Sequence, residues 1–128
     1  MPDQAPEDSL FTRIGGKAAV DAVVDLLYNR LLRDVEVGRF FTDMDERAQR
    51  RKMKVFLAYA FGALPNYSGA SLREAHRPLV EEKGLTDIHF DVVAEHLQSI
   101  LLELHVPESL VEEVMAIVGS TRNEVLNR

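Results

Sequence analysis

The sequence of 128 residues contains no cysteine, and this absence excludes several kinds of site at once. A disulfide framework, a thiolate zinc site, a cysteine nucleophile and an iron–sulfur cluster all require cysteine sulfur. Long apolar runs are also lacking, since no segment approaches the ~18 residues needed to span a bilayer. The first nine residues, MPDQAPEDS, lack the basic and apolar regions of a signal peptide. We therefore expect a soluble cytoplasmic protein with no membrane partner.

Positive charge is in deficit, because 15 Lys and Arg residues face 21 Asp and Glu residues and give a formal net charge of −6. That balance disfavours a nucleic-acid partner held through its phosphates. The length is typical of one domain, and the hydrophobic content of 46% is sufficient for a packed core. We expect a flexible tail over 1–8 and one globular domain over 9–128, acting as a monomer.

Glycine and proline divide the chain into segments whose apolar residues recur at helical spacing, and no segment shows sustained strand alternation. The pattern predicts helices over 18–32, 45–62 and 87–105, and a final helix from Pro107 to the C-terminus. The segment around Pro78 is expected to be kinked or broken into short turns, because proline has no amide hydrogen to donate. The predicted fold class is all-α, with four substantial helices.

Four histidines, at positions 76, 89, 96 and 105, are spaced too widely for two of them to bind one metal from the same helix. An HExxH motif, a Gly-rich phosphate loop and a nucleophile elbow are missing from the sequence. A metal held by side chains alone is therefore not expected. His76 differs from the others because it shares an apolar stripe with Leu72 and Leu79. It fits either a core histidine bonded to a backbone carbonyl or the single ligand that haem takes from a protein.

Polar side chains interrupt the apolar faces of two other predicted helices. Tyr28 lies within an apolar stripe, and Gln49 and Lys52 share a helix face with Met53 and Phe56. Each has a simple structural explanation, either a core tyrosine with its hydroxyl at the rim or long side chains at the edge of a stripe. Together with the histidine in its own apolar stripe, these residues favour a ligand pocket.

Five basic residues fall within 47–54, namely Arg47, Arg50, Arg51, Lys52 and Lys54. Such a run is usually a solvated helix face, and no second recognition element of a helix-turn-helix accompanies it. The same charges are also suited to pairing with carboxylates such as haem propionates. A haem-free helical interaction module that binds a partner through the 47–54 face is an alternative, and it predicts salt-sensitive binding and no haem absorption.

Six segments taken together resemble the group I truncated haemoglobins. They occur in order from Ser9 almost to the end of the chain: SLFTRIGGKAAVDAVVDLLYNRLL, FFTDMD, QRRKMKVFLAYAFG, LREAHRPLV, HFDVVAEHL and VPESLVEEVMAIV. The resemblance implies a truncated 2-on-2 globin fold, in which two antiparallel helix pairs sandwich haem b. It also implies that the proximal helix is shortened largely to a loop.

The resemblance further implies roles for individual residues. His76, in the segment REAH, corresponds to the proximal iron ligand, and Tyr28 corresponds to the distal tyrosine that donates a hydrogen bond to bound oxygen. Gln49 corresponds to a distal polar position, and Phe41 to the phenylalanine that packs on the porphyrin. Met53 stands where the family often has glutamine or leucine, so an altered tyrosine–glutamine pair is expected.

Lys52, flanked by the apolar Met53 and Phe56, corresponds to a distal position that in some members supplies a side chain able to bind iron. Only the neutral amine has the lone pair for this, and a hexacoordinate haem would result, from which an external ligand must displace the lysine. The alternative is that Lys52 extends outward to a propionate, and the sequence leaves both open. No histidine follows His105, so the covalent histidine–haem link of certain members is expected to be absent.

The function implied by the resemblance is binding of O2, NO, CO or similar ligands at the haem iron. Oxidation of nitric oxide to nitrate by bound oxygen is known in the family. A protein acting in this way would be a nitric oxide dioxygenase that depends on electrons from an external reductase. Oxygen transport, storage or sensing is the alternative within the haem proteins.

Overall fold

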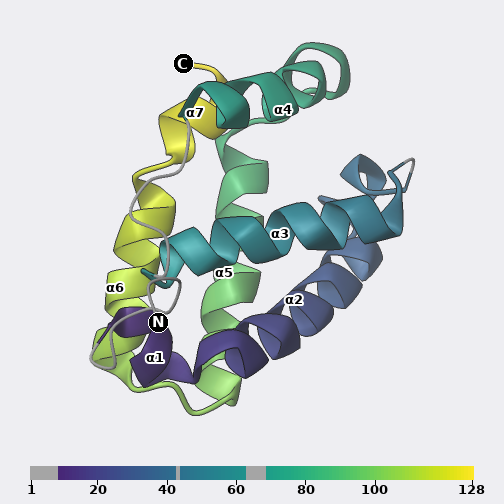
Figure 1. Ribbon diagram of the computed structural model, residues 1–128. Coiled ribbons are helices and arrows are strands. Elements are labelled where there is room, and N and C mark those ends of the chain that lie inside the picture. The colour runs from purple at the N-terminus through teal and green to yellow at the C-terminus, as the bar shows by residue number, and fades with distance from the viewer. Residues whose placement is uncertain (1–8, 43, 63–68) are drawn as a thin grey trace.

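The computed structural model describes residues 9–42, 44–62 and 69–128, and the tail expected over 1–8 lies outside them. Within these residues the chain forms α-helices and one 3-10 helix and contains no strand, which confirms the all-α class (Figure 1). None of the described helices is long and apolar enough to cross a membrane. The elements in chain order are α1 (Leu10–Ile14), α2 (Gly16–Arg33), η1 (Gly38–Phe40), α3 (Glu46–Ala60), α4 (Gly69–Lys83), α5 (Asp87–Glu103), α6 (Glu108–Gly119) and α7 (Arg122–Leu126).

Local sequence signals set several of the helix ends. The hydroxyl of Ser9 accepts a hydrogen bond from the amide of Thr12 at the start of α1, and the carboxylate of Asp45 accepts one from the amide of Ala48 at the start of α3. Gly15 separates α1 from α2 with a φ of 133°, a conformation that residues with a side chain rarely adopt. These short-range contacts set the starts of α1, α2 and α3, and the start of α3 agrees with the boundary predicted at position 45.

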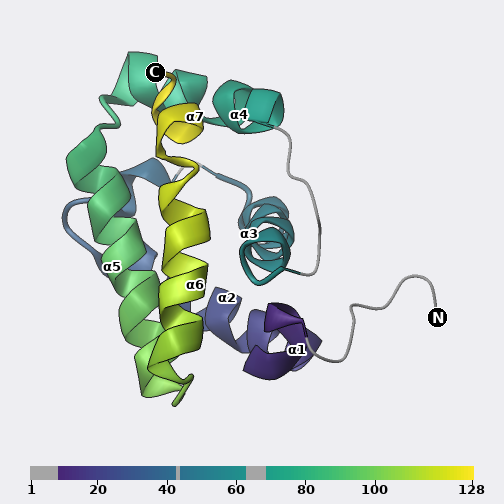
Figure 2. The same ribbon diagram turned by 90° about the vertical axis from the view of Figure 1, so that its left-hand side faces the viewer.

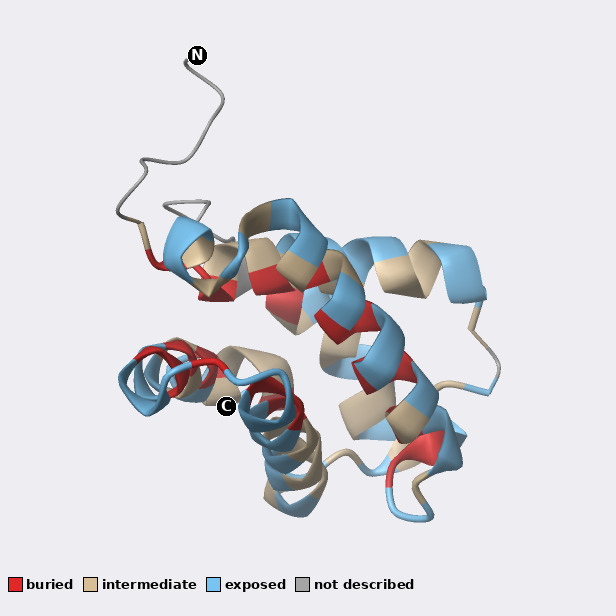
Figure 3. Ribbon diagram, turned by 90° about the horizontal axis from the view of Figure 1, so that it is seen from below, coloured by how far each residue is buried: buried red, intermediate tan, exposed pale blue. Residues whose placement is uncertain are grey.

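The longer helices pack as two antiparallel pairs. α2 lies against α3, and α5 lies beside α6, while α2 also packs on α5 and joins the pairs (Figures 1 and 2). The faces that the helices turn toward one another carry the buried residues (Figure 3). Among the most completely buried are Val23, Leu31, Leu57, Phe61 and Ile100. Because apolar burial is the dominant favourable term in folding, this shared core fixes where the two pairs stand.

The expected break at Pro78, and the expected shortening of this segment to a loop, are wrong. α4 runs as one helix from Gly69 to Lys83 with Pro78 inside it. The proline removes one helical hydrogen bond, so the carbonyl of Glu74 loses its usual donor. Both residues are exposed, so water can satisfy that carbonyl. Packing of α4 on α7 then outweighs the local penalty.

The single final helix expected from Pro107 to the C-terminus is also wrong, because α6 ends at Gly119 and α7 begins at Arg122. Thr121 is buried between them, and its hydroxyl donates to the carbonyl of Val118 at 2.7 Å. The hydroxyl of Ser120 likewise donates to the carbonyl of Ile117. Such side-chain bonds compete with the main-chain ladder and favour a helix end. The break lets α7 pack on α4.

Candidate functional site

A cavity of about 440 Å³ lies between the helix pairs and α4. It is lined mainly by apolar side chains from α3, α4, α5 and the segment 37–41, with smaller contributions from α2, α6 and α7. Its apolar walls include Leu31, Val37, Phe40, Phe41, Met53, Phe56, Leu57, Leu72, Leu79, Phe90, Val93, Leu97, Val118 and Val125. Residues from both helix pairs therefore enclose one space, which is the pocket predicted from the interrupted stripes.

His76 is the polar side chain that α4 contributes to the cavity. Its Nδ1 lies 2.8 Å from the carbonyl oxygen of Leu72, and because a carbonyl only accepts, Nδ1 carries the proton. Burial lowers the pKa of His76, the bond to Leu72 opposes that effect, and the positive charge of Lys52 lowers the pKa further. The ring is therefore neutral near pH 7, and its Nε2 keeps a lone pair with which to bind a metal.

The α3 face predicted from spacing lines the cavity in full. Gln49, Lys52, Met53 and Phe56 all contribute to its wall. Lys52 remains exposed while it does so, whereas Met53 and Phe56 are half-buried and pack against the core. The helical spacing alone was enough to group these four side chains, because they occupy successive turns of one helix.

Phe41 lines the cavity, but Tyr28 is not among the residues that do so. Tyr28 is 1% exposed and packs edge-on against Phe41, with 5.9 Å between the ring centroids. Burial raises the pKa of Tyr28 and the charge of Glu46 raises it further, while Arg50 lowers it. The phenol is therefore protonated near neutral pH and its hydroxyl is a hydrogen-bond donor.

Arg50 covers the ring of Tyr28, with its guanidinium carbon 4.6 Å from the ring centroid. Its side chain also donates to Asp25 at 2.8 Å, to Asn29 at 3.1 Å and to Glu46 at 3.0 Å. The basic 47–54 run is thus partly used within the protein, since Lys54 also pairs with Asp21 at 3.1 Å. A guanidinium bonded on three sides and stacked on an aromatic ring holds α2 and α3 together beside the cavity.

His89 lines the cavity and was not predicted as a site residue. Its Nδ1 accepts the amide N–H of Thr86 at 3.0 Å at the start of α5, and its ring packs edge-on against Phe40 with centroids 4.9 Å apart. The signal that could have located it is the capping-box spacing of Thr86 and a residue three positions later. Histidine is an unusual partner in that motif, so the pattern is difficult to recognise from sequence.

Asp34, at the C-terminal end of α2, connects the turn beneath the cavity to α5. Its carboxylate accepts from Nε2 of His96 at 2.7 Å and from the amides of Glu36 and Val37. Val37 then lines the cavity. The hydrogen bond from His96 is the main reason that the pKa of Asp34 is lowered, and the two backbone amides add to it against the opposing effect of burial.

Asp34→Asn is expected to destabilise the protein at pH 7 and much less at pH 3, because asparagine keeps one oxygen for the two amides but places an uncharged NH2 group where the carboxylate accepts from His96. A carboxyl whose folded pKa is lowered stabilises the fold above its unfolded value of about 3.9, and this contribution is lost as pH falls through the folded pKa. Urea unfolding at both pH values measures the difference. Glu36→Gln, at the exposed neighbour, is the control. An equal destabilisation at both pH values would contradict the assignment.

The side chains at the cavity supply too few ligands to hold a metal ion by themselves. Across 9–42, 44–62 and 69–128, no group of three or more His, Asp or Glu side chains is placed to hold an ion. His76 supplies one nitrogen, so a metal beside it must arrive with most of its ligands already provided by a bound organic group. The apolar wall suits the body of such a group, and the charge of Lys52 suits an anionic substituent of it.

Comparisons with known proteins agree with this site. Residues 9–127 match the model of the family described as bacterial-like globin. The curated group 1 truncated hemoglobin GlbN of Synechocystis sp. is 46% identical over 122 residues, which cover 94% of this chain and 98% of that protein. The crystal structure of the 2/2 hemoglobin from Synechococcus sp., with covalently attached heme, is 48% identical, covers 94% of this chain and 99% of its own, and superposes with a TM-score of 0.87. THB1 of Chlamydomonas reinhardtii is 45% identical with a TM-score of 0.85, covering 94% of this chain and 98% of its own.

Proposed function

Since this chain belongs to the bacterial-like globin family, as a group 1 truncated haemoglobin, we propose that it binds haem b non-covalently in the cavity and a diatomic ligand such as O2 at the haem iron. The membership also establishes the 2-on-2 globin fold predicted from the sequence. When bound, haem would supply an iron that can take one nitrogen ligand from the protein and bind a diatomic gas, and His76 would be the residue that holds it.

The observation that carries this proposal is the state of His76. Its Nδ1–H is bonded to the carbonyl of Leu72, which orients the ring and leaves Nε2 with its lone pair inside an apolar cavity. That arrangement is typical of a metal-binding histidine, because the bond at one nitrogen fixes the tautomer at the other. Phe41, Met53 and Phe56 would contact the apolar body of the cofactor.

Tyr28 and Gln49 would act on the diatomic ligand, Gln49 from the cavity wall and Tyr28 from beside the cavity-lining Phe41, on which its ring packs. The hydroxyl of Tyr28 stays protonated and donates toward partial negative charge on the ligand, and the amide of Gln49 is a second donor from the cavity wall. Because each such bond favours the bound state, the side chains set how slowly the ligand leaves.

Tyr28→Phe is expected to speed O2 dissociation by about 10- to 100-fold, the equivalent of one hydrogen bond to a charged group at about 1.5–3 kcal/mol. Stopped-flow displacement of O2 by CO measures the rate. Tyr59→Phe, which removes a phenol hydroxyl from α3 instead of α2, serves as the control. Unchanged O2 dissociation in Tyr28→Phe would remove Tyr28 from this role.

The test of the whole proposal is an absorbance spectrum of the purified protein with one equivalent of haemin, in the ferric and ferrous states. Stoichiometric binding with a Soret band is expected. A protein without such a band would favour the haem-free interaction module instead, and that module predicts salt-sensitive binding through the 47–54 face.

Lys52 is proposed as the distal iron ligand in the absence of gas. It lines the same cavity as His76 from α3, and its charge is close enough to affect the histidine. Low-spin six-coordinate spectra are expected for the wild type and high-spin spectra for Lys52→Ala. Lys54→Ala is the matched control, since Lys54 pairs with Asp21 and does not line the cavity. Identical spectra for wild type and Lys52→Ala would exclude ligation and leave Lys52 to pair with a propionate.

For the reaction, we propose nitric oxide dioxygenation, in which O2, NO and one electron give nitrate. The cavity provides a largely apolar space where two small gases can meet, and the electron must come from an external reductase. Mixing the O2-loaded ferrous protein with one equivalent of NO should yield one equivalent of nitrate. Slow or substoichiometric nitrate would favour oxygen storage or sensing instead.

A further inference from the structure

α4, the helix that carries His76, is held on the rest of the protein chiefly by α7 (Figure 1). Two polar contacts cross between them near the first turns of α4. The guanidinium of Arg73 donates to the carbonyl oxygen of Arg128 at 3.1 Å, and the amide of Asn127 donates to the carbonyl oxygen of Arg73 at 3.1 Å. Asn127 has a φ of 59°, which turns the chain after α7 back toward α4.

These contacts reach the peptide group next to the one that orients His76. Asn127 bonds the carbonyl of Arg73, and the preceding carbonyl, that of Leu72, accepts Nδ1–H of His76. Leu72 itself is 6% exposed and lines the cavity. A displacement of α7 would therefore move the acceptor that sets the direction of the histidine ring.

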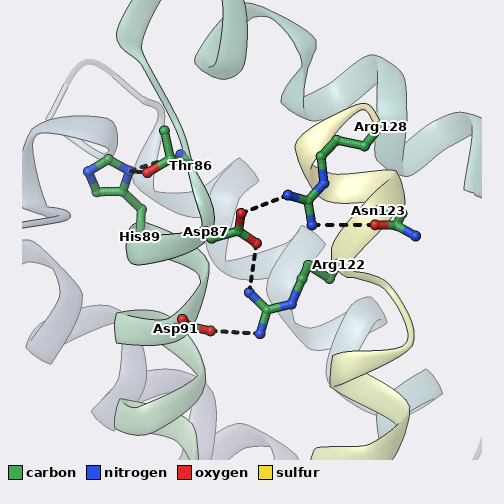
Figure 4. Close-up of polar contacts among 7 residues, drawn as sticks. All are labelled: Thr86, Asp87, His89, Asp91, Arg122, Asn123 and Arg128. Carbon is green, nitrogen blue, oxygen red and sulfur yellow. Dashed lines mark hydrogen bonds and ion pairs between the residues drawn. The ribbon is translucent and has the colours of Figure 1, made fainter.

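α7 is anchored in turn on α5 by a cluster of charged side chains (Figure 4). Asp87, the first residue of α5, accepts from Arg122 at 3.0 Å and from Arg128 at 2.7 Å. The other arm of the Arg122 fork donates to Asp91 at 2.6 Å. The same guanidinium lies 4.5 Å from the ring centroid of Phe90, which lines the cavity.

The cluster differs from an ordinary surface ion pair in three respects. One carboxylate is shared by two guanidinium groups, one guanidinium bridges two carboxylates a helical turn apart, and Asp87 sits where the α5 dipole favours negative charge. An isolated exposed ion pair contributes little to the stability of a fold. Planar guanidinium groups that share carboxylates in a network hold their partners in a fixed orientation. The two arginines lower the pKa of Asp87, Arg128 having the larger effect, so the carboxylate is charged throughout the neutral range.

We propose that Asp87, Arg122 and Arg128 form a positioning cluster that, through α7 and Asn127, holds the Leu72 carbonyl and thereby sets the orientation of His76 toward the haem iron. The inference rests on the proposed role of His76 as the axial ligand. The three charged residues do not touch the cofactor in this scheme and act only through α7 and α4.

The test compares wild type, Asp87→Asn and a matched control, Arg30→Gln, in the full-length haem-loaded chain. Arg30 pairs with Glu103 at 2.7 Å and joins α2 to α5, so it is a charged pair of similar length away from α4. In Asp87→Asn, amide hydrogen exchange over α4 should speed up about five- to tenfold, since two charged contacts of α7 are lost together. The ferrous iron–histidine stretching frequency, recorded for all variants in the Lys52→Ala background so that no lysine occupies the iron, should also shift. Arg30→Gln should change neither measurement.

Arg122→Lys tests the same cluster if Asp87→Asn folds poorly. Arg122→Lys retains the charge but cannot bridge both carboxylates, so it should shift the iron–histidine frequency in the same direction by a smaller amount. The double variant should be no worse than Asp87→Asn, because both substitutions break one network. Unchanged α4 exchange and an unchanged frequency in Asp87→Asn would overturn the positioning role.

The proposed function fails by a different outcome. If the wild type takes up no haem, no iron–histidine band exists in any variant, while the exchange over α4 still reports whether the cluster holds that helix. Haem binding with a normal band but no difference between Asp87→Asn and Arg30→Gln leaves the function intact and rejects the cluster.

Discussion

Replacing His76 with glycine is expected to lower haem affinity by more than about 100-fold. Loss of a residue that only hydrogen-bonds to a metal ligand already lowers metal affinity by about 10- to 100-fold, and here the ligand itself is removed. His76 is the neutral nitrogen donor that α4 places in the cavity, with its tautomer fixed by Leu72. Glycine leaves room for a free imidazole where the side chain was. Added imidazole should therefore restore a haem spectrum close to that of the wild type.

Haemin titration followed at the Soret maximum measures this effect. The matched control is His105→Gly, because His105 is exposed and has a φ of 62°, so glycine fits there without strain. His105→Gly should bind haem as the wild type does. If His76→Gly retained wild-type affinity and spectrum, with no response to imidazole, another residue such as His89 or Lys52 would have to be the axial ligand.

Gly38→Ala is expected to destabilise the fold by about 1–3 kcal/mol, the usual cost of forcing an extra carbon into a well-packed site. A Cβ at Gly38 would lie 2.8 Å from the carbonyl oxygen of Leu32 and 3.3 Å from that of Leu31. Both are backbone atoms at the end of α2, so they cannot rotate away as a side chain would. The strain falls on the turn that carries Phe40 and Phe41 to the cavity, so haem affinity should fall as well.

Urea unfolding of the protein measures this loss, and Gly119→Ala provides the control. A Cβ at Gly119 meets no heavy atom within 4 Å, and the residue ends α6 with no positive φ. Alanine is favoured over glycine in helices by roughly 0.5–1 kcal/mol, so Gly119→Ala should be neutral or slightly stabilising. Equal stability of Gly38→Ala and the wild type would mean that the α2–η1 turn shifts freely to accept the methyl group.

Much of the candidate site was accessible from the sequence because its parts repeat within single helices. Gln49, Lys52, Met53 and Phe56 lie on one face by spacing alone, and the structure places all four on the cavity wall. His76 was distinguished by its apolar neighbours in the same way. Helical periodicity is a local property, so one sequence suffices to group such residues.

For Tyr28 and His89, helical periodicity did not predict which side chain lines the cavity. The stripe of α2 placed Tyr28 on the inner face, and it is buried there, yet it packs on Phe41 and is not part of the cavity wall. His89 does line the wall, and its only local signal is the capping-box spacing with Thr86, which does not point to a cavity. Which side of a buried ring faces a cavity depends on how neighbouring helices cross, and that is not encoded in the spacing along one helix.

The sequence by itself determined the all-α class, the apolar face of each long helix and the position of His76 within an apolar stripe. Tertiary structure alone decided that α4 continues through Pro78, because packing on α7 outweighs the local penalty of the proline. It also decided the pairing of Asp34 with His96, 62 residues away, and the contact of Arg73 with Arg128, 55 residues away. Periodicity and capping act within a few turns of one helix, whereas these contacts exist only once the core has brought distant helices together.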